Sequence, residues 1–155
     1  VNLNIEIERK FTVNEIPKNI TNSFVIEQFY MLIDKDFVQR LRIFDNKKAI
    51  ISLKQNCSGL KRYEFEYEIP LVDAQKIISI GNFLNIKKIR HELIVDNIKW
   101  EVDQFLEKNE GLVIAEVELQ NEDQKLNLPK WIEKDVTNQN KYYNYNLAIN
   151  PYISW

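Results

Sequence analysis

Polar and apolar residues alternate along most of this chain with a period of two. That is the pattern of β-strands whose two faces meet different surroundings. In the first such segment apolar Leu3, Ile5 and Ile7 alternate with Glu6, Glu8 and Lys10. The same alternation predicts eight strands in all, over residues 3–12, 26–33, 37–44, 49–55, 61–69, 86–95, 98–105 and 112–119. Strands spaced in this way fit an antiparallel meander or barrel.

Turn and helix signals complete the predicted outline. Dipeptides suited to tight turns occur at Asp45-Asn46, Ser58-Gly59 and Asp96-Asn97. Helical spacing is rarer, and it predicts a helix from Asp73 to about residue 85, a short helix over 128–133 and a last helix over 138–149. The fold class is therefore a β-rich α+β protein with a few packing helices.

Length and composition fit one domain over residues 1–155. The chain has 45% hydrophobic and 28% charged residues, with only 3 glycines and 4 prolines, so no flexible linker divides it. A formal net charge of -2 argues against a dedicated nucleic-acid binder. No apolar run reaches the roughly 18 residues of a transmembrane helix, and residues 1–4 lack the features of a signal peptide. We expect a cytoplasmic protein without a membrane partner.

The polar faces of the predicted strands are unusually dense in charges of both signs. Every second residue contributes to the set Glu6, Glu8, Lys10, Arg40, Arg42, Lys54, Arg62, Glu64, Glu66, Glu68, Lys88, Arg90, Glu92, Glu101, Asp103, Glu116 and Glu118. The polar face of an ordinary antiparallel sheet meets water and carries a looser mixture. The density of this set is therefore the feature that needs an explanation.

Two architectures fit these faces. In a sandwich the apolar faces form the core and the charges are solvated outside. In a closed barrel the polar faces turn inward and helices cover the apolar exterior. A lumen crowded with both signs is costly without a ligand, whereas a polyanion with metal ions neutralises both sets. Carboxylate oxygens suit Mg²⁺ or Mn²⁺, and guanidinium groups offer paired donors to phosphate.

Several other kinds of site are excluded by residue counts. The single cysteine, Cys57, cannot form a disulfide within the chain or a cysteine-based zinc site. The single histidine, His91, excludes a multi-histidine metal site. No glycine-rich phosphate loop is present either.

Specific motifs then point to a family. Glu6-Ile7-Glu8-Arg9-Lys10 matches the ExExK signature of the CYTH family, also called triphosphate tunnel metalloenzymes. Further segments resemble family motifs in the family's order: Arg40-Leu41-Arg42-Ile43, Ser52-Leu53-Lys54, Ser58-Gly59-Leu60-Lys61-Arg62 leading into 64–70, Lys88-Ile89-Arg90, Trp100-Glu101-Val102-Asp103, 115–119 and 141–152. The resemblance spans nearly the whole chain.

The resemblance implies a closed eight-stranded antiparallel β-barrel, with a few helices packed outside and a C-terminal helix at the tunnel. It assigns metal binding to Glu6, Glu8, Glu116 and Glu118, helped by Glu66 and Asp103. It assigns phosphate binding to Lys10, Arg40, Arg42, Lys54, Arg62, Lys88 and Arg90. Among these, Lys10 is expected to stabilise the reacting phosphate, and Lys54 or Lys88 to assist the attacking water.

The implied activity is Mg²⁺- or Mn²⁺-dependent hydrolysis of a triphosphate, with inorganic tripolyphosphate as the expected substrate. Adenylate cyclase and thiamine or nucleoside triphosphatase activities share the scaffold and stay open, as does a catalytically silent polyphosphate-binding module. The expected partner is thus a small-molecule triphosphate. Tyr142 or Tyr143 of the terminal stretch is expected to present a hydroxyl to the tunnel. The sequence carries no signal of oligomeric state.

Overall fold

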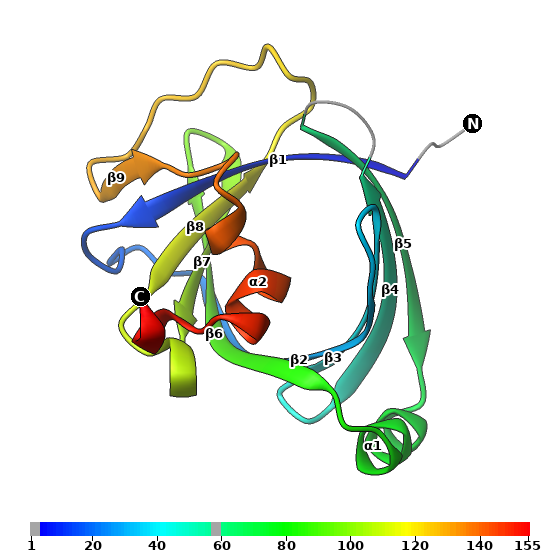
Figure 1. The fold of residues 1–155 in the computed structure, drawn as a ribbon. Helices are drawn as coiled ribbons and strands as arrows, with labels where there is room; N and C mark the ends of the chain where they lie inside the picture. Colours follow the sequence, from blue (N-terminus) through cyan, green and yellow to red (C-terminus); the bar gives the residue numbers. More distant parts are fainter. Residues whose placement is uncertain (1–3, 57–59) are drawn as a thin grey trace.

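One antiparallel sheet closes into a ring in this computed structural model, which describes residues 4–56 and 60–155. Within that part of the chain the strands are β1 (Ile5–Val13), β2 (Asn22–Ile33), β3 (Phe37–Phe44), β4 (Lys48–Asn56), β5 (Lys61–Ile69), β6 (Leu84–Val95), β7 (Ile98–Phe105), β8 (Val113–Glu118) and β9 (Ile132–Asp135). Their order is β5-β4-β3-β2-β6-β7-β8-β1-β9, and β5 also pairs with β1 (Figure 1). The predicted closed eight-stranded barrel is confirmed, with β9 added to it.

Strand β1 is the closing strand because it exchanges partners along its length. Its start pairs with β5, from Ile5 opposite Tyr63 to Ile7 opposite Lys61. From Phe11 to Val13 β1 pairs with β9 instead, and from Glu8 to Thr12 it pairs with β8. Pairing on both edges leaves little of β1 open to another chain.

The hairpin turns follow the sequence signals. Asp45, Asn46, Asp96 and Asn97 all have positive φ, between 48° and 61°. Two consecutive positive φ values are those of the type I′ turn, which matches the twist of the flanking strands. Cys57 and the turn predicted at 58–59 lie outside the described residues.

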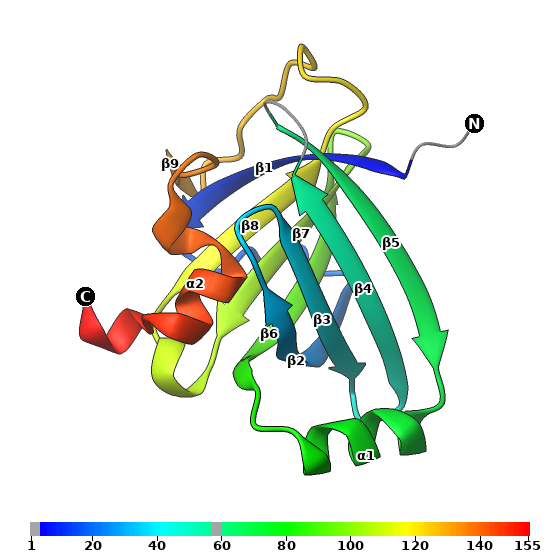
Figure 2. The same cartoon turned by 45° about the vertical axis from the view of Figure 1, so that its right-hand side comes forward.

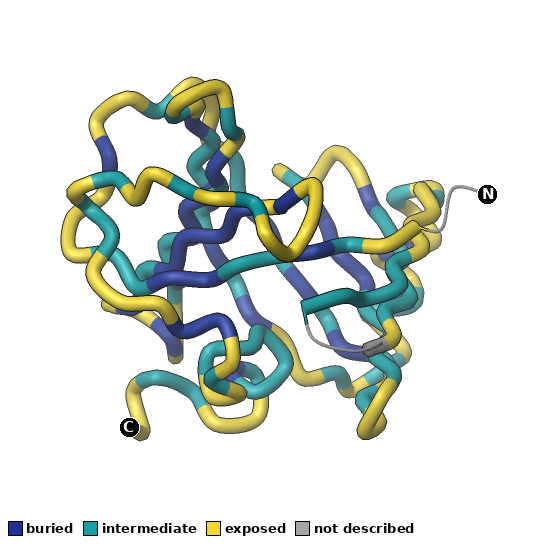
Figure 3. Tube along the Cα trace, turned by 90° about the horizontal axis from the view of Figure 1, so that it is seen from above, coloured by how far each residue is buried: buried dark blue, intermediate teal, exposed yellow. Residues whose placement is uncertain are grey.

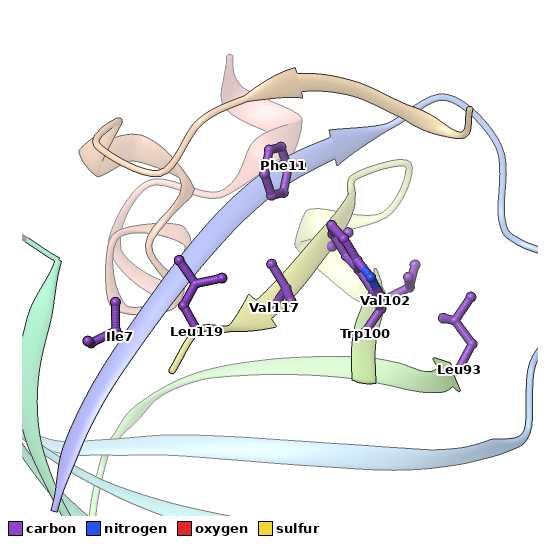
Figure 4. Packing of buried hydrophobic residues seen from close by; sticks show 8 residues of the cluster. Ile7, Phe11, Leu93, Trp100, Val102, Val117 and Leu119 are labelled. Atoms are coloured by element: carbon purple, nitrogen blue, oxygen red, sulfur yellow. The ribbon is translucent and has the colours of Figure 1, made fainter. Parts of the chain in front are cut away.

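The main hydrophobic cores lie on the outer surface of the barrel. One of them gathers Phe11, Trp100, Val102, Val117 and their neighbours (Figure 4), and the segment after β8 covers it with Trp131 and Ile132. Figure 3 shows buried segments running through the strands and exposed ones in the loops that join them. Since inward and outward residues alternate, this packing turns the polar faces toward the lumen.

A second outer core lies under α1 (Leu71–Ile80), which sits beside the ends of β4 and β5 (Figure 2). Leu41, Ile43 and Ala49 of the barrel pack there against Ala74 of the helix. The helix was predicted to run to about residue 85 but ends at Gly81. A Cβ at Gly81 would lie 2.0 Å from a ring carbon of Phe83, so a larger residue there would force that ring to move. The next residues, from Leu84, join β6.

The other two helix predictions also need correction. Residues 128–133 form no α-helix, because Ile132 instead begins β9 and pairs with Val13. The predicted helix over 138–149 is split into a 3₁₀ turn, Asn140–Tyr142, and α2, Asn144–Ile149. Between them Tyr143 is extended, with φ −70° and ψ 137°. Two further 3₁₀ turns are Glu107–Asn109 and Tyr152–Ser154.

The C-terminal helix α2 lies within the outline of the strand ring in Figure 1, as predicted for a helix at the tunnel. Leu147 of α2 is fully buried in a third cluster, with Tyr30, Ile86, Phe105 and Ile114. Ile86 shares a strand face with Lys88, and Ile114 shares one with Glu116. Apolar side chains therefore fill the barrel at this end, beneath α2.

Candidate active site

The lumen holds a polar cavity of about 420 Å³ to which every strand of the eight-stranded ring contributes. The predicted site residues that line it are Glu6, Glu8, Lys10, Arg40, Arg42, Lys54, Arg62, Glu66, Lys88, Arg90, Glu116 and Glu118. Their faces turn inward, so the sandwich alternative is wrong. Residues that are more than 100 positions apart in the sequence thus share one chamber.

Strands β1 and β8 bring carboxylates face to face. Glu8 lies directly opposite Glu118, and Lys10 lies opposite Glu116. The Lys10 Nζ donates to Glu8 Oε1 at 2.9 Å and also to Glu116, and the residue is only 5% exposed. Burial lowers the pKa of Lys10, but the charges of Glu116 and Glu8 outweigh it and raise the pKa above its usual value. Lys10 is therefore a firmly charged ammonium between two carboxylates.

Glu116 and Glu118 differ in how their charge is balanced. Burial raises the pKa of Glu116, but Lys10, Lys88 and Arg90 outweigh it and hold this pKa well below the usual value. Glu118 has no ion pair with any basic side chain in the described part of the chain. Burial and the nearby charge of Glu6 raise the pKa of Glu118, with further carboxylates adding to the effect. The Glu118 side of the lumen is accordingly short of positive charge.

Asp103 does not occupy the position expected of a metal ligand. It is fully buried and does not line the cavity. Its carboxylate accepts from Lys88 Nζ at 2.5 Å and from Arg90 Nε and Nη2 at 2.7 Å each. Arg90 lies directly opposite Asp103 on the paired strand and covers it. Asp103 thus anchors two of the cations that line the lumen.

The arginines of β3 form a second cationic wall. Arg40 Nη2 donates to Glu64 at 2.7 Å, and Arg42 contacts Glu66 and donates to Ser52 Oγ at 3.2 Å. The buried Nε groups of Arg40 and Arg42 find no acceptor among the described residues. Burial and the charge of Arg40 lower the pKa of Arg42 to about 10. Unused donors in a crowded cationic wall suit an anionic ligand.

The cavity continues between β4, β5 and the chain before α2. Lys54 contacts Glu6 and lies 3.7 Å from Glu64 Oε2. The guanidinium of Arg62 stacks 5.0 Å from the centre of the Tyr143 ring. Of the two tyrosines considered, Tyr143 lines the cavity, although its hydroxyl donates to the Thr137 carbonyl at 3.1 Å. Tyr142 lies against Trp155, with ring centroids 5.2 Å apart.

The structure adds lining residues that the sequence did not assign to the site. They are chiefly Gln28 and Tyr30 of β2, Glu64 of β5, Glu101 of β7 and Tyr145 of α2. Glu64 and Glu101 lie on the dense polar faces and follow from the alternation alone. Gln28 and Tyr30 lie in a largely apolar strand. The only sequence feature that could have placed them in the site is their spacing of two residues, which puts both on the same face.

The donor set fits a divalent metal ion. Its oxygens are hard ligands, and two glutamates spaced two apart on a strand present their carboxylates on one face. Like charges directly opposite, such as Glu8 and Glu118, are destabilising unless a cation lies between them. Glu6 Oε2 is buried and contacts the ammonium of Lys54. In this arrangement no three described carboxylate, thiol or imidazole groups converge into a complete metal site.

A closed antiparallel barrel with cations and carboxylates facing one another across its lumen defines the class of triphosphate tunnel proteins. The chain belongs to the CYTH family: the model of the CYTH domain matches residues 4–147. CYTH membership implies that a divalent metal ion takes part.

Individual relatives agree with this placement. The chain is 40% identical over 149 residues to an inorganic triphosphatase of Acetivibrio thermocellus, with 95% of each chain covered. It is 27% identical over 147 residues to an inorganic triphosphatase of Nitrosomonas europaea, covering 93% of this chain and 97% of that one. A crystal structure of an inorganic triphosphatase superposes with a TM-score of 0.70 at 26% identity, over 93% of this chain and 94% of the other.

No helix within residues 4–56 and 60–155 combines the length and the apolar character needed to cross a membrane.

Proposed function

We propose that this protein hydrolyses inorganic tripolyphosphate to pyrophosphate and phosphate with Mg²⁺ or Mn²⁺. The observation that carries the proposal is one cavity lined by dense charges of both signs. Carboxylates of β1 and β8 and guanidinium groups of β3 and β6 all line it. A polyphosphate with a divalent cation satisfies both sets of charges, whereas an organic group would leave charges unpaired. The Acetivibrio and Nitrosomonas relatives are inorganic triphosphatases.

In this mechanism the cationic side chains position the chain of phosphates and stabilise its charge. Arg40 and Arg42 donate paired N–H groups to non-bridging oxygens, and Arg90 and Lys88 hold the opposite side. Lys10 lies next to the carboxylates and stabilises charge that grows on the reacting phosphate. Lys54 or Lys88 assists the attacking water.

Glu6, Glu8, Glu116 and Glu118 would hold a divalent ion, which supplies Lewis-acid polarisation of phosphate oxygens and a water of lowered pKa. Glu66, half-exposed and bound to Arg42, is a helper that would join them if Arg42 turned to substrate. Asp103 has a different role, because its oxygens are filled by Lys88 and Arg90. It keeps those two cations in place.

The test is phosphate release from tripolyphosphate, ATP and thiamine triphosphate in Mg²⁺ or Mn²⁺, with EDTA as the blank and Glu116→Gln as the matched variant. We expect tripolyphosphate to be the best substrate and the variant to lose metal activation. Faster release of cyclic AMP and pyrophosphate from ATP would favour a cyclase. Binding of tripolyphosphate without turnover in either metal would favour a silent binding module.

A further inference from the structure

The inward face of β2 is the neutral part of the lumen. Ile26, Gln28 and Tyr30 occupy this face, and none of them carries a charge. The partner strand β3 places Arg42 directly opposite Gln28 and Arg40 directly opposite Tyr30. Two buried polar groups without charge therefore stand beside the cationic wall, in a strand where apolar residues would have filled the space.

Tyr30 presents a hydroxyl whose hydrogen is unused. The residue is 6% exposed and Gln28 is 1% exposed, yet both line the cavity. The Gln28 amide Nε2 donates to the Tyr30 hydroxyl oxygen. No described residue accepts the hydrogen of that hydroxyl. Because buried donors are nearly always paired, this one points to a ligand that accepts a hydrogen bond.

Packing and charge both favour such a donor at this place. The Tyr30 ring is packed with Ile86, Phe105 and Leu147, so its position is set without a ligand. Burial raises the pKa of Tyr30 and outweighs Arg40, so the phenol keeps its proton at neutral pH. Burial and Arg40 already lower the pKa of Arg42 to about 10. A neutral donor adds a hydrogen bond there without adding to the repulsion between the cations.

We infer that Tyr30 is a further substrate-binding residue, whose hydroxyl donates to a non-bridging oxygen of the phosphate chain beside Arg40 and Arg42. Gln28 acts as its positioning residue, because its amide fixes the phenol oxygen. The inference rests on the proposed function only in that the ligand is a phosphate chain. It makes β2 part of the recognition surface together with the charged strands.

The test is calorimetric titration of tripolyphosphate into wild type and Tyr30→Phe in EDTA at low ionic strength. A hydrogen bond to a charged group stabilises by an amount that corresponds to about tenfold to a hundredfold in affinity. We expect Tyr30→Phe to bind that much more weakly. Tyr67→Phe is the matched control, because Tyr67 lies on β5 with 57% of its surface exposed. It should bind as wild type does.

The double variant Gln28→Met/Tyr30→Phe removes both polar groups together, which costs little stability when the shape is kept. It should melt close to wild type and bind as weakly as Tyr30→Phe. Wild-type affinity in either variant overturns the role of Tyr30, as does an equal loss in Tyr67→Phe. The proposed activity is tested by a different measurement, phosphate release by the wild type in Mg²⁺ or Mn²⁺. Its result does not depend on the ratio of the wild-type affinity to that of Tyr30→Phe.

Discussion

Lys10 connects the carboxylates of β1 and β8 through its ammonium group. Its ammonium lies between Glu8 and Glu116, and Glu116 in turn reaches Arg90 at 2.9 Å. Removing one member of a buried charge network leaves its partners uncompensated. In the proposed mechanism the same ammonium faces a bound phosphate, so Lys10 would combine a stability role with a catalytic one.

Replacement of Lys10 tests the two roles with different measurements. Acid unfolding reports the stability role, and kcat/KM reports the catalytic one. The lowered pKa of Glu116 means that its charge contributes stability above its ordinary value of 4.5, and that this contribution is lost as the pH falls through the lowered pKa. In Lys10→Met the pKa of Glu116 rises, so acid unfolding should begin at higher pH. The free energy of unfolding at pH 7 should fall by about 1–3 kcal/mol. Circular dichroism across an acid titration measures both effects.

The same variant should lose about a hundredfold in kcat/KM for tripolyphosphate, the scale of one lost electrostatic stabiliser. Lys48→Met is the control, because Lys48 and its partner Glu68 are 52% and 65% exposed and such pairs contribute little. A Lys10→Met protein with wild-type acid unfolding and wild-type kcat/KM would refute both roles.

Glu118 predicts an effect of the opposite sign. Its pKa is raised by burial and by Glu6, so its charge costs stability once the pH exceeds the ordinary value of 4.5. Without divalent metal, Glu118→Gln should therefore raise the melting temperature at pH 7 by about 1–2 °C, and the gain should vanish near pH 4. Calorimetry in EDTA at the two pH values measures this gain. The Mn²⁺ concentration for half-maximal activity should rise about tenfold.

Glu15→Gln, on an exposed loop residue, serves as the control for Glu118→Gln and should change neither quantity. A lower melting temperature for Glu118→Gln in EDTA would mean that the carboxylates do not repel one another as described.

Strand parity predicted which side chains line the lumen, because a strand alternates its faces whatever the tertiary contacts. It predicted Glu6, Glu8 and Lys10 together, and likewise the pairs on β3 and β8. Alternation along a strand does not predict whether an inward side chain lines the cavity or is covered by a neighbouring one. Asp103 faces inward, but Arg90 reaches over it, and this contact depends on the register between β6 and β7.

At the scale of elements, α2 and the residue before it determine how one side of the cavity is built. Tyr143 interrupts the helical stretch, stacks on Arg62 and ties its hydroxyl to Thr137. The side chain of Thr137 in turn accepts from the Lys10 backbone N–H at 3.0 Å. The C-terminal segment is thus joined both to Arg62, a proposed phosphate-binding residue, and to strand β1.

Two substitutions at Tyr143 test this connection. Tyr143→Leu removes the ring over Arg62, and KM for tripolyphosphate should rise about threefold to thirtyfold, the range for a cation–π contact that is partly desolvated. Tyr143→Phe keeps the ring and loses only the hydrogen bond to Thr137, so KM should stay near wild type. Steady-state kinetics of the two variants decides the matter, and equal KM values for Leu and Phe would contradict a role for the ring.

The elements that sequence could not predict are those governed by tertiary contacts. β9 has four residues, too few for a clear alternation, and it forms because β1 has an edge to satisfy. The proline at 129 suggested a helix start, yet Trp131 instead packs edge-on against Trp100 at 5.4 Å. Helix α1 stops early because the backbone becomes extended at Gly81, with φ −99° and ψ 162°, and the residues from Leu84 pair in β6.

At the scale of the molecule, the seam between β1 and β5 closes the ring with the fewest contacts. It joins residues 5–7 to 61–63, whereas β3 and β4 pair from Phe37 to Phe44. Charged residues from both sides of the seam face the cavity, Glu6 from β1 and Arg62 from β5. A ligand held by both strands would therefore strengthen the part of the barrel with the least pairing.

Hydrogen exchange should report this strengthening. Amides of residues 5–7 and 61–63 should exchange faster than those in the middle of β3 and β4, because fewer contacts must open. Tripolyphosphate at about 100 times its Kd should slow the seam by up to about a hundredfold. Mass spectrometry of peptides from both regions measures this, and the β3–β4 peptides serve as the internal control. Equal slowing of both regions would mean that the seam does not open on its own.

The arrangement of the cores outside the barrel has a consequence for how such a protein can change. Outward residues such as Phe11, Trp100 and Val117 supply the hydrophobic packing that stabilises the fold. The residues between them along the same strands line the cavity. A library that randomises only inward positions leaves the outer packing untouched, so many of its members should fold while presenting new chambers. Adjacent residues of one strand are therefore constrained differently, one by packing outside the barrel and the next by ligand binding inside it. The lumen can be redesigned for another anion without changing the outer core.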